Sequence, residues 1–457
     1  MHEQQQRHHI LVMSCGAQGH INPSLELAKR LLRAGAGHVT FITSVSALDK
    51  IRSPVSLEGL SYATFSEGNP TGLTNFIEEM RRAGSESLHR LIDRMVDEGR
   101  HVTFLVYTVL LPWAADVARE RGIPSAFLCI QSAATLAVYD WWFPSEDDVP
   151  PPGSIVLPGL PPLSIKDVPT FLLPDDQHHS IAPLFREHMA VIRRGGEDST
   201  VLVNTFDALE GHLLKALVSL GKVIAIGPLV PSACTDEDGS AEKSLGCDLF
   251  DSDQSQYLPW LNSQAESSVV YVSFGSMIAL NKTEIRSTFD GLVDSSKPFL
   301  WALRTPESPD EKEAFESVKH ELDLNTGLIV PWCSQVEVLN HPSVGCFVTH
   351  CGWNSTLEGL AAGVPTVGCP HFSDQTLNAK MIEEVWKTGI RATSDENGII
   401  TRDETRRCIE LVMVSEEGKE MRQKARRWRV WATEAVREGG SSDNNLRKFM
   451  DGIPSIK

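Results

Sequence analysis

The sequence lacks the positive charge that marks proteins of nucleic acids and anionic surfaces. Its 42 Lys and Arg against 60 Asp and Glu give a formal net charge of −18. No basic tract compensates for this balance, so we expect neither a nucleic-acid partner nor an anionic membrane partner. An anionic ligand of this protein has to be held by local groups.

The nine cysteines form no CxxC pair, are odd in number and are scattered along the chain. This pattern favours reduced thiols in a cytosolic protein over a disulfide framework or a zinc site. His350 and Cys351 are adjacent, but no companion ligands stand at a suitable spacing. We therefore expect no metal cofactor.

Long hydrophobic runs are also missing. The first apolar run, Ile10–Met13, is too short for the core of a signal peptide. The longest apolar stretch, Val102–Ala118, is interrupted by Thr108, Pro112 and Asp116, which indicates a strand, a turn and a helix. We expect no membrane insertion and a cytoplasmic location.

The length of 457 residues, 41% of them hydrophobic, exceeds one ordinary core and suits two domains. Strand-like runs alternate with helical patterns, such as a helix at Asn22–Ala34, which predicts two doubly wound α/β domains. We place them at 1–240 and 257–457, joined through an acidic segment at 231–256 that is either a linker or a surface loop. The expected strands are Ile10–Met13, Val39–Ile42, Thr103–Val106, Ser125–Leu128, Val201–Asn204, Val269–Phe274, Phe299–Leu303, Gly327–Val330, Cys346–Thr349 and Thr366–Gly368.

The most informative segment runs from Trp332 to Gln375. Within it, an apolar strand, a glycine turn and a helix follow one another. Asn354–Thr356 supplies N-cap residue types at the helix start, and Gly363 with Pro365 marks its end. The first helical turn presents unpaired N–H groups and the positive end of the helix dipole, which suit a diphosphate.

Two further side chains fit the same ligand. His350, at the carboxyl end of the strand, points at the anion, and Glu358 lies one turn after Asn354, where it can accept hydrogen bonds from ribose hydroxyls. Taken singly, Trp332 and Trp353 are also compatible with core aromatics, and Glu358 with a solvated helix face. Their occurrence together favours a nucleotide-sugar site.

This segment resembles, without a gap, the signature box of plant family 1 UDP-dependent glycosyltransferases, and the rest of the chain is collinear with that family. The resemblance implies a GT-B fold, in which two Rossmann-like domains face each other across a cleft and the last helical stretch, Lys419–Gly452, crosses back to the first domain. Animal members carry a membrane anchor, which we do not expect here. The matching residues are Trp332-Cys-Ser-Gln335, His350-Cys-Gly-Trp-Asn-Ser355, Glu358, Pro365 and Pro370-His-Phe-Ser-Asp374-Gln375.

The resemblance also implies a set of donor contacts. Glutamine at position 375 is typical of glucose users and histidine there of galactose users, so the expected donor co-substrate is UDP-glucose. The uridine contacts would be Trp332 on the uracil, the Cys333 backbone, the Gln335 side chain and Glu358 on the ribose. The phosphate contacts would be Ser276, His350, Asn354 and Ser355, and the sugar contacts would be Trp353, Asp374 and Gln375.

A catalytic base is expected in the turn after the first strand. The stretch Ile10–Pro23 resembles the N-terminal motif of the family, in which the residue at His20 ends the loop and removes the acceptor's proton. Histidine suits this role because its ordinary pKa, about 6.5, leaves it mostly neutral at cytosolic pH. The acceptor oxygen then displaces UDP with inversion, and an α-linked donor gives a β-glucoside.

Thr108 marks a departure from the family, many members of which place an aspartate there to orient the histidine. A hydroxyl can accept from the imidazole N–H but cannot neutralise an imidazolium. Because acidic acceptors need less help from a base, we expect phenolic acids, carboxylated hormones, apocarotenoids or acidic flavonoid and anthocyanin hydroxyls. Tyr107-Thr108 with Leu110–Trp113 resembles the subgroup of anthocyanin and carboxylate glucosyltransferases, and Asp116 is a lower-ranked partner for His20.

Several alternatives stay open at this point. The proline-rich region Trp141–Asp176 is either a surface loop or a wall of the acceptor pocket. One alternative is a UDP-sugar-binding pseudoenzyme or sensor. A dehydrogenase is disfavoured, because no GxGxxG motif follows a strand. We expect a monomer, and the product is an ester, an O-glucoside or, less favoured, a C- or N-glucoside.

Overall fold

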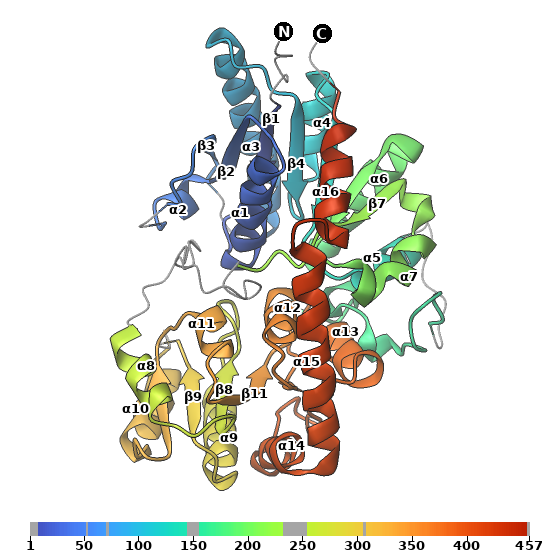
Figure 1. Ribbon diagram of the computed structural model, residues 1–457. Helices are drawn as coiled ribbons and strands as arrows, with labels where there is room; N and C mark the ends of the chain where they lie inside the picture. Colours follow the sequence, from blue (N-terminus) through green and yellow to red (C-terminus); the bar gives the residue numbers. More distant parts are fainter. Residues whose placement is uncertain are drawn as a thin grey trace. The chain divides into compact units, whose positions relative to one another are not determined.

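The computed structural model describes residues 8–51, 54–69, 73–143, 155–231, 254–304 and 308–454, so most of the expected 231–256 segment lies outside the described residues. The chain divides into two compact units (Figure 1). Unit 1 holds the described residues up to Pro231 together with 434–454, and unit 2 holds those from 254 to Thr433.

Unit 1 is built on a seven-stranded parallel sheet in the order β3-β2-β1-β4-β5-β6-β7. The central strands β1 (His9–Met13) and β4 (Phe104–Thr108) are buried at every position, as expected for a parallel sheet that is covered on both faces. The strand order reverses between them, which makes the β1/β4 junction the switch point of the sheet. The other strands are β2 (His38–Ser44), β3 (Leu60–Phe65), β5 (Ser125–Cys129), β6 (Thr200–Val203) and β7 (Lys222–Ala225).

The last helix of the chain, α16 (Ser441–Asp451), packs on unit 1 (Figure 1, red). Ser442 Oγ donates to the Gly227 carbonyl at 2.5 Å, and the Phe449 ring meets Phe104 edge to face at 5.2 Å. The other α-helices described in unit 1 are α1 (Gln18–Arg33), α2 (Val45–Leu48), α3 (Leu73–Asp97), α4 (Trp113–Glu120), α5 (Ala133–Trp142), α6 (Ala182–Gly195) and α7 (Asp207–Ala216).

Unit 2 contains a six-stranded parallel sheet in the order β10-β9-β8-β11-β12-β13, with its switch point between β8 and β11. Successive residues of β8 enter two separate core clusters, Val270 and Val272 one of them and Val269 and Tyr271 the other. Both faces of the sheet are therefore covered. The strands are β8 (Val269–Ser273), β9 (Phe299–Ala302), β10 (Gly327–Val330), β11 (Val344–Thr349), β12 (Thr366–Gly368) and β13 (Gly389–Arg391).

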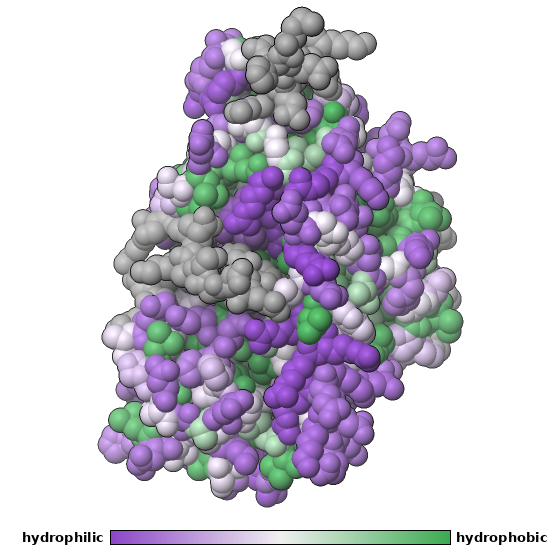
Figure 2. Space-filling view, in the orientation of Figure 1, coloured by the Kyte–Doolittle hydropathy of each residue, from purple (hydrophilic) through white to green (hydrophobic). Residues whose placement is uncertain are grey.

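The α-helices of unit 2 include most of the 21-residue α15, whose last residues from Glu434 belong to unit 1 and which is hydrophilic on the face that Figure 2 shows. Those described are α8 (Gln254–Asn262), α9 (Lys282–Asp294), α10 (Pro309–Glu321), α11 (Gln335–Leu339), α12 (Trp353–Ala362), α13 (Gln375–Lys380), α14 (Arg402–Val414) and α15 (Glu416–Val436).

The predicted doubly wound α/β fold is confirmed. All ten expected strands form, and the three that the sequence pattern missed are β3, β7 and β13. Each of these three lies at an edge of its sheet and is partly exposed, so it lacks the continuous apolar run that identifies a central strand. Helix α1 starts at Gln18, earlier than the predicted start at Asn22.

Candidate functional site

The predicted donor residues of unit 2 gather at one edge of its sheet. Ser276 follows β8, Trp332 follows β10, His350 follows β11 and Asp374 follows β12. Since these strands are parallel, their carboxyl ends lie at the same edge, where open α/β sheets bind ligands.

The helix that starts at this edge, α12, begins at Trp353 with Gly352 as its N-cap. The prediction that Asn354–Thr356 provides the N-cap is therefore wrong, and Asn354 lies inside the first turn. Cys351, directly before the N-cap, adopts a left-handed conformation, with φ of 64°. Glycine has no side chain with which to cap the helix, so this end keeps the polarity that suits an anion.

Trp353 contributes its side chain to the core of unit 2. The residue is 4% exposed, and its ring centroid lies 5.9 Å from that of Trp386. The core interpretation thus holds for the indole, while the backbone of Trp353 lies in the first turn of α12. A contact between Trp353 and a sugar at this position would involve the backbone.

His350 is partly buried between two glycines. A Cβ built on Gly275 would come within 2.8 Å of the ring, and one built on Gly352 within 2.5 Å of Nε2, so a side chain at either position would displace the ring. Burial and then the nearby His371 lower the pKa of His350 to about 3, against an opposing hydrogen bond to the Ser273 backbone. His350 therefore offers an anion a neutral imidazole.

A hydrogen-bonded cluster joins three of the predicted nucleoside and phosphate ligands. Gln335 Nε2 donates to Ser355 Oγ at 2.9 Å and to Glu358 Oε2 at 2.6 Å, while the Tyr271 hydroxyl donates to Gln335 Oε1 at 3.4 Å. Glu358 is only 8% exposed, which rejects the solvated-face interpretation. Cys333 is buried beside Tyr271, with 3.4 Å between its sulfur and the hydroxyl oxygen.

Trp332, which precedes Cys333 in the chain, is partly exposed. A partly exposed indole can stack on a planar base.

The loop after β12 fixes the side chain of Gln375. Its Oε1 accepts from the backbone N–H groups of His371 at 2.9 Å and Phe372 at 3.0 Å. The amide nitrogen is then the part of Gln375 left to donate to a ligand. Asp374 is held by Asn378, whose Nδ2 donates to Asp374 Oδ2 at 2.8 Å.

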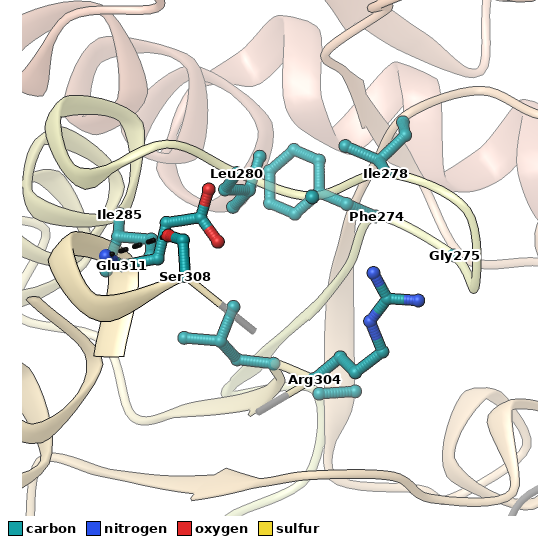
Figure 3. A pocket seen from close by; sticks show the side chains of 11 residues that line it. Phe274, Gly275, Ile278, Leu280, Ile285, Arg304, Ser308 and Glu311 are labelled. Carbon is teal, nitrogen blue, oxygen red and sulfur yellow. Dashed lines mark hydrogen bonds between the residues drawn. The ribbon is translucent and has the colours of Figure 1, made fainter. Parts of the chain in front are cut away.

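Arg304 holds the turn that carries Ser276, and the sequence interpretation missed it. Its Nη1 donates to the Ser276 carbonyl at 2.9 Å. Figure 3 shows the guanidinium beside the Gly275 turn, at a cavity of about 250 Å³ that Phe274 also lines. A basic residue directly after the expected strand Phe299–Leu303 was the available signal, because that strand ends at the same edge.

In unit 1, His20 and Thr108 both lie at the switch point. His20 belongs to the first turn of α1, so its expected place in the preceding loop is wrong, and Thr108 ends the neighbouring strand β4. The expected hydrogen bond between them is not formed: the Thr108 hydroxyl donates to the Val109 carbonyl at 3.4 Å. In the described part of the chain, His20 Nδ1 is buried without a hydrogen-bond partner, and burial lowers the pKa of His20 to about 4.

Asp116, the alternative partner for His20, is engaged elsewhere. It accepts from Arg119 at 3.1 Å and from Arg194 at 2.9 Å. We therefore set this alternative aside.

The aromatic region 141–176 is only partly described, since 144–154 lies outside the described residues. In the described part, Phe171 is fully buried and stacks on Phe185 with ring centroids 4.5 Å apart. At Phe171 the region is thus packed core rather than exposed loop.

Among the residues with described positions, no group of three or more His, Cys, Asp or Glu side chains could hold a metal ion. The seven cysteines within those ranges are buried, and none of them forms a disulfide there. No helix there is both long and apolar enough to cross a bilayer.

Two doubly wound units, one with a polar cluster and a helix start at its switch-point edge, define the class of nucleotide-sugar-binding α/β proteins. Comparison with known proteins gives the family. Residues 243–422 match the model of "UDP-glucoronosyl and UDP-glucosyl transferase". UDP-glycosyltransferase 75C1 of Solanum lycopersicum is 47% identical, over 97% of this chain and 98% of that protein.

Crocetin glucosyltransferase, chloroplastic, of Gardenia jasminoides is 48% identical, over 98% of this chain and 97% of that protein. Among solved structures, Os79 of O. sativa in complex with UDP superposes with a TM-score of 0.85 at 31% identity, over 98% of this chain and all of the other. The chain belongs to the UDP-glycosyltransferase family and is an enzyme of that kind, which confirms the resemblance seen in the sequence.

Proposed function

We propose that this protein transfers glucose from UDP-glucose, with inversion, to a hydroxyl or carboxyl group of a small lipophilic plant metabolite. Unit 2 binds the donor and unit 1 binds the acceptor. The observation that carries the donor assignment is the hydrogen-bonded Gln335–Ser355–Glu358 cluster together with the start of α12, whose N-cap Gly352 has no side chain. The relatives named as glucosyltransferases support glucose as the sugar.

On the donor side, Trp332 stacks on the uracil, while the Cys333 backbone and Gln335 contact the nucleoside and Glu358 accepts from the ribose hydroxyls. The diphosphate lies at the start of α12, where His350 is a neutral hydrogen-bond donor. The phosphate ligands are Ser276, His350, Asn354 and Ser355, and the sugar contacts are the Trp353 backbone, Asp374 and Gln375.

On the acceptor side, the acceptor oxygen forms a bond to the anomeric carbon while the bond from that carbon to the β-phosphate oxygen breaks. The electron pair of the broken bond leaves with UDP, and His20 takes the acceptor's proton. With its pKa lowered to about 4, His20 is neutral at ordinary pH but is a weak base. A carboxylate needs no base and a phenol needs little, so we propose acidic acceptors.

The unpartnered His20 Nδ1 supports this choice, because no carboxylate stabilises the imidazolium in the described structure. The Gardenia relative is named for crocetin, a carboxylate. We further propose that the enzyme works as a monomer without a metal. A cytoplasmic location also belongs to the proposal, and since that relative is named chloroplastic, a fluorescent fusion would test it.

The test measures UDP release from UDP-glucose by wild type and His20→Ala with carboxylic acids, phenols and simple alcohols. We expect carboxylate turnover to stay within about tenfold and phenol turnover to fall by about 100-fold, the usual contribution of a general base. Equal losses for both acceptor classes would reject the acidic-acceptor proposal. Binding of UDP-glucose without turnover of any acceptor would favour a sensor.

A further inference from the structure

His371, in the loop after β12, lies between two hydrogen-bond acceptors. Its Nδ1 is 2.8 Å from the Cys369 carbonyl, and its Nε2 is 3.4 Å from Glu284 Oε1 on helix α9. A carbonyl can only accept, so Nδ1 of the imidazole donates in the first of these contacts. The second contact joins the ring, in the loop, to the carboxylate on α9.

Glu284 is suited to this contact. Burial acts to raise its pKa, but the hydrogen bond from His371 and that from the Asn281 backbone outweigh burial, so the net shift is downward. The two carboxylate oxygens make different contacts. Oε2 accepts from the Asn281 N–H at 2.8 Å as part of the capping box of α9. Glu284 is therefore anchored to a helix end and presents Oε1 to the loop.

His371 also holds the side chain of Gln375. The backbone N–H of His371 is one of the two donors to Gln375 Oε1, at 2.9 Å. The rings of His371 and Phe274 pack edge to face, with their centroids 5.4 Å apart and their planes at 79°. A shift of His371 would therefore move a donor that fixes the direction of the Gln375 amide.

We propose that the His371–Glu284 pair positions the loop after β12 so that Gln375 directs its N–H groups at the sugar of the donor. His371 and Glu284 are positioning residues in this scheme, since they act through Gln375. The inference rests on the proposed function, in which Gln375 contacts the sugar. It predicts that losing the pair weakens binding of UDP-glucose more than binding of UDP.

Three substitutions of His371 separate its two hydrogen bonds. His371→Gln can place an amide nitrogen near the position of Nε2 and keep the bond to Glu284. His371→Asn can place one near Nδ1 and keep only the bond to Cys369, and His371→Phe keeps neither. We expect the dissociation constant of UDP-glucose to rise about tenfold in the Asn and Phe variants and less than about threefold in the Gln variant, the scale of one lost hydrogen bond.

The same measurements with UDP should change by less than about twofold in all three variants, because UDP lacks the sugar. Glu284→Ala should weaken UDP-glucose binding as His371→Phe does. The double variant should be no weaker than either single one, since both remove the same contact. Equal weakening of UDP and UDP-glucose, or additive losses in the double variant, would overturn the proposal.

Two controls keep the outcomes separate. Asn281→Ala removes the side-chain cap of α9 while leaving His371 and Glu284 in place, so it should lower Tm without selective loss of UDP-glucose binding. Trp332→Ala tests the donor site itself. Unchanged UDP binding in Trp332→Ala would reject the proposed function, whereas weaker UDP binding there with unchanged UDP-glucose binding in His371→Asn would reject only the positioning role.

Discussion

The proposed donor site of unit 2 and the proposed base of unit 1 differ in how completely their polar groups are hydrogen-bonded. Gln335 has partners at both ends of its amide, and Gln375 Oε1 accepts two backbone donors. In unit 1, by contrast, Nδ1 of the proposed base His20 is buried without a hydrogen-bond partner among the described residues.

His188 of α6 extends the contrast. Both of its ring nitrogens are buried without hydrogen-bond partners in the part of the chain that the structure describes, and its ring lies 4.8 Å from Phe127 and 6.2 Å from Tyr107. A hydrogen-bonded set of side chains is selective, because a ligand that does not match it leaves polar groups unpaired. We propose that Gln335 and Gln375 make unit 2 selective for its donor, whereas the surroundings of His20 in unit 1 impose fewer polar requirements on an acceptor.

The largest expected effect comes from removing the centre of the donor cluster. Glu358→Ala leaves the Gln335 amide without its charged partner and removes the ribose contact, so kcat/KM for UDP-glucose should fall about 100-fold. Glu358→Gln should lose about tenfold. Steady-state kinetics with Glu417→Ala, an exposed glutamate of α15, provide the control. A loss below about threefold would show that the cluster is structural.

A second substitution should give His20 the hydrogen-bond partner that it lacks. Thr108→Asp places a carboxylate where many family members have one, so turnover of phenols should rise about tenfold while turnover of carboxylates stays the same. Thr108→Val should change both by less than about twofold, because the Thr108 hydroxyl bonds to the Val109 carbonyl rather than to His20. A folded Thr108→Asp variant that loses activity on both acceptor classes would contradict the interpretation.

The same contrast explains what the sequence could predict. The central strands were predictable from continuous apolar runs, which are a local pattern. The donor residues could be proposed from another local pattern, the gap-free segment from Trp332 to Gln375 around one helix start. The edge strands β3, β7 and β13 and the surroundings of His20 were not predictable, because these partly exposed strands lack a continuous apolar run and Thr108 bonds to its own neighbour. Arg304 and Glu284 act across elements far apart in the sequence, which no local pattern shows.

A smaller effect is expected at the turn that carries Ser276. Arg304→Met removes the hydrogen bond to the Ser276 carbonyl, so the dissociation constant of UDP should rise about fivefold, while Arg304→Lys should recover part of the loss. Isothermal titration with UDP measures this change, and Arg427→Met, at an exposed site on α15, is the matched control. Wild-type affinity in Arg304→Met would show that the turn holds its shape without this contact.

The smallest effect tests the unpaired state of His20 directly. Its pKa of about 4 lies below the ordinary value of about 6.5, so the base form dominates above pH 4 and is lost only as pH falls through that value. For a phenol that does not titrate in the range, kcat/KM should therefore change by less than about twofold between pH 6 and pH 8. In Thr108→Asp the carboxylate favours the imidazolium, so the fall of kcat/KM at acidic pH should begin at a higher pH. A fall of the wild-type kcat/KM near pH 6.5 that disappears in His20→Ala would show that His20 is solvated or paired. The contrast between the two units would then fail.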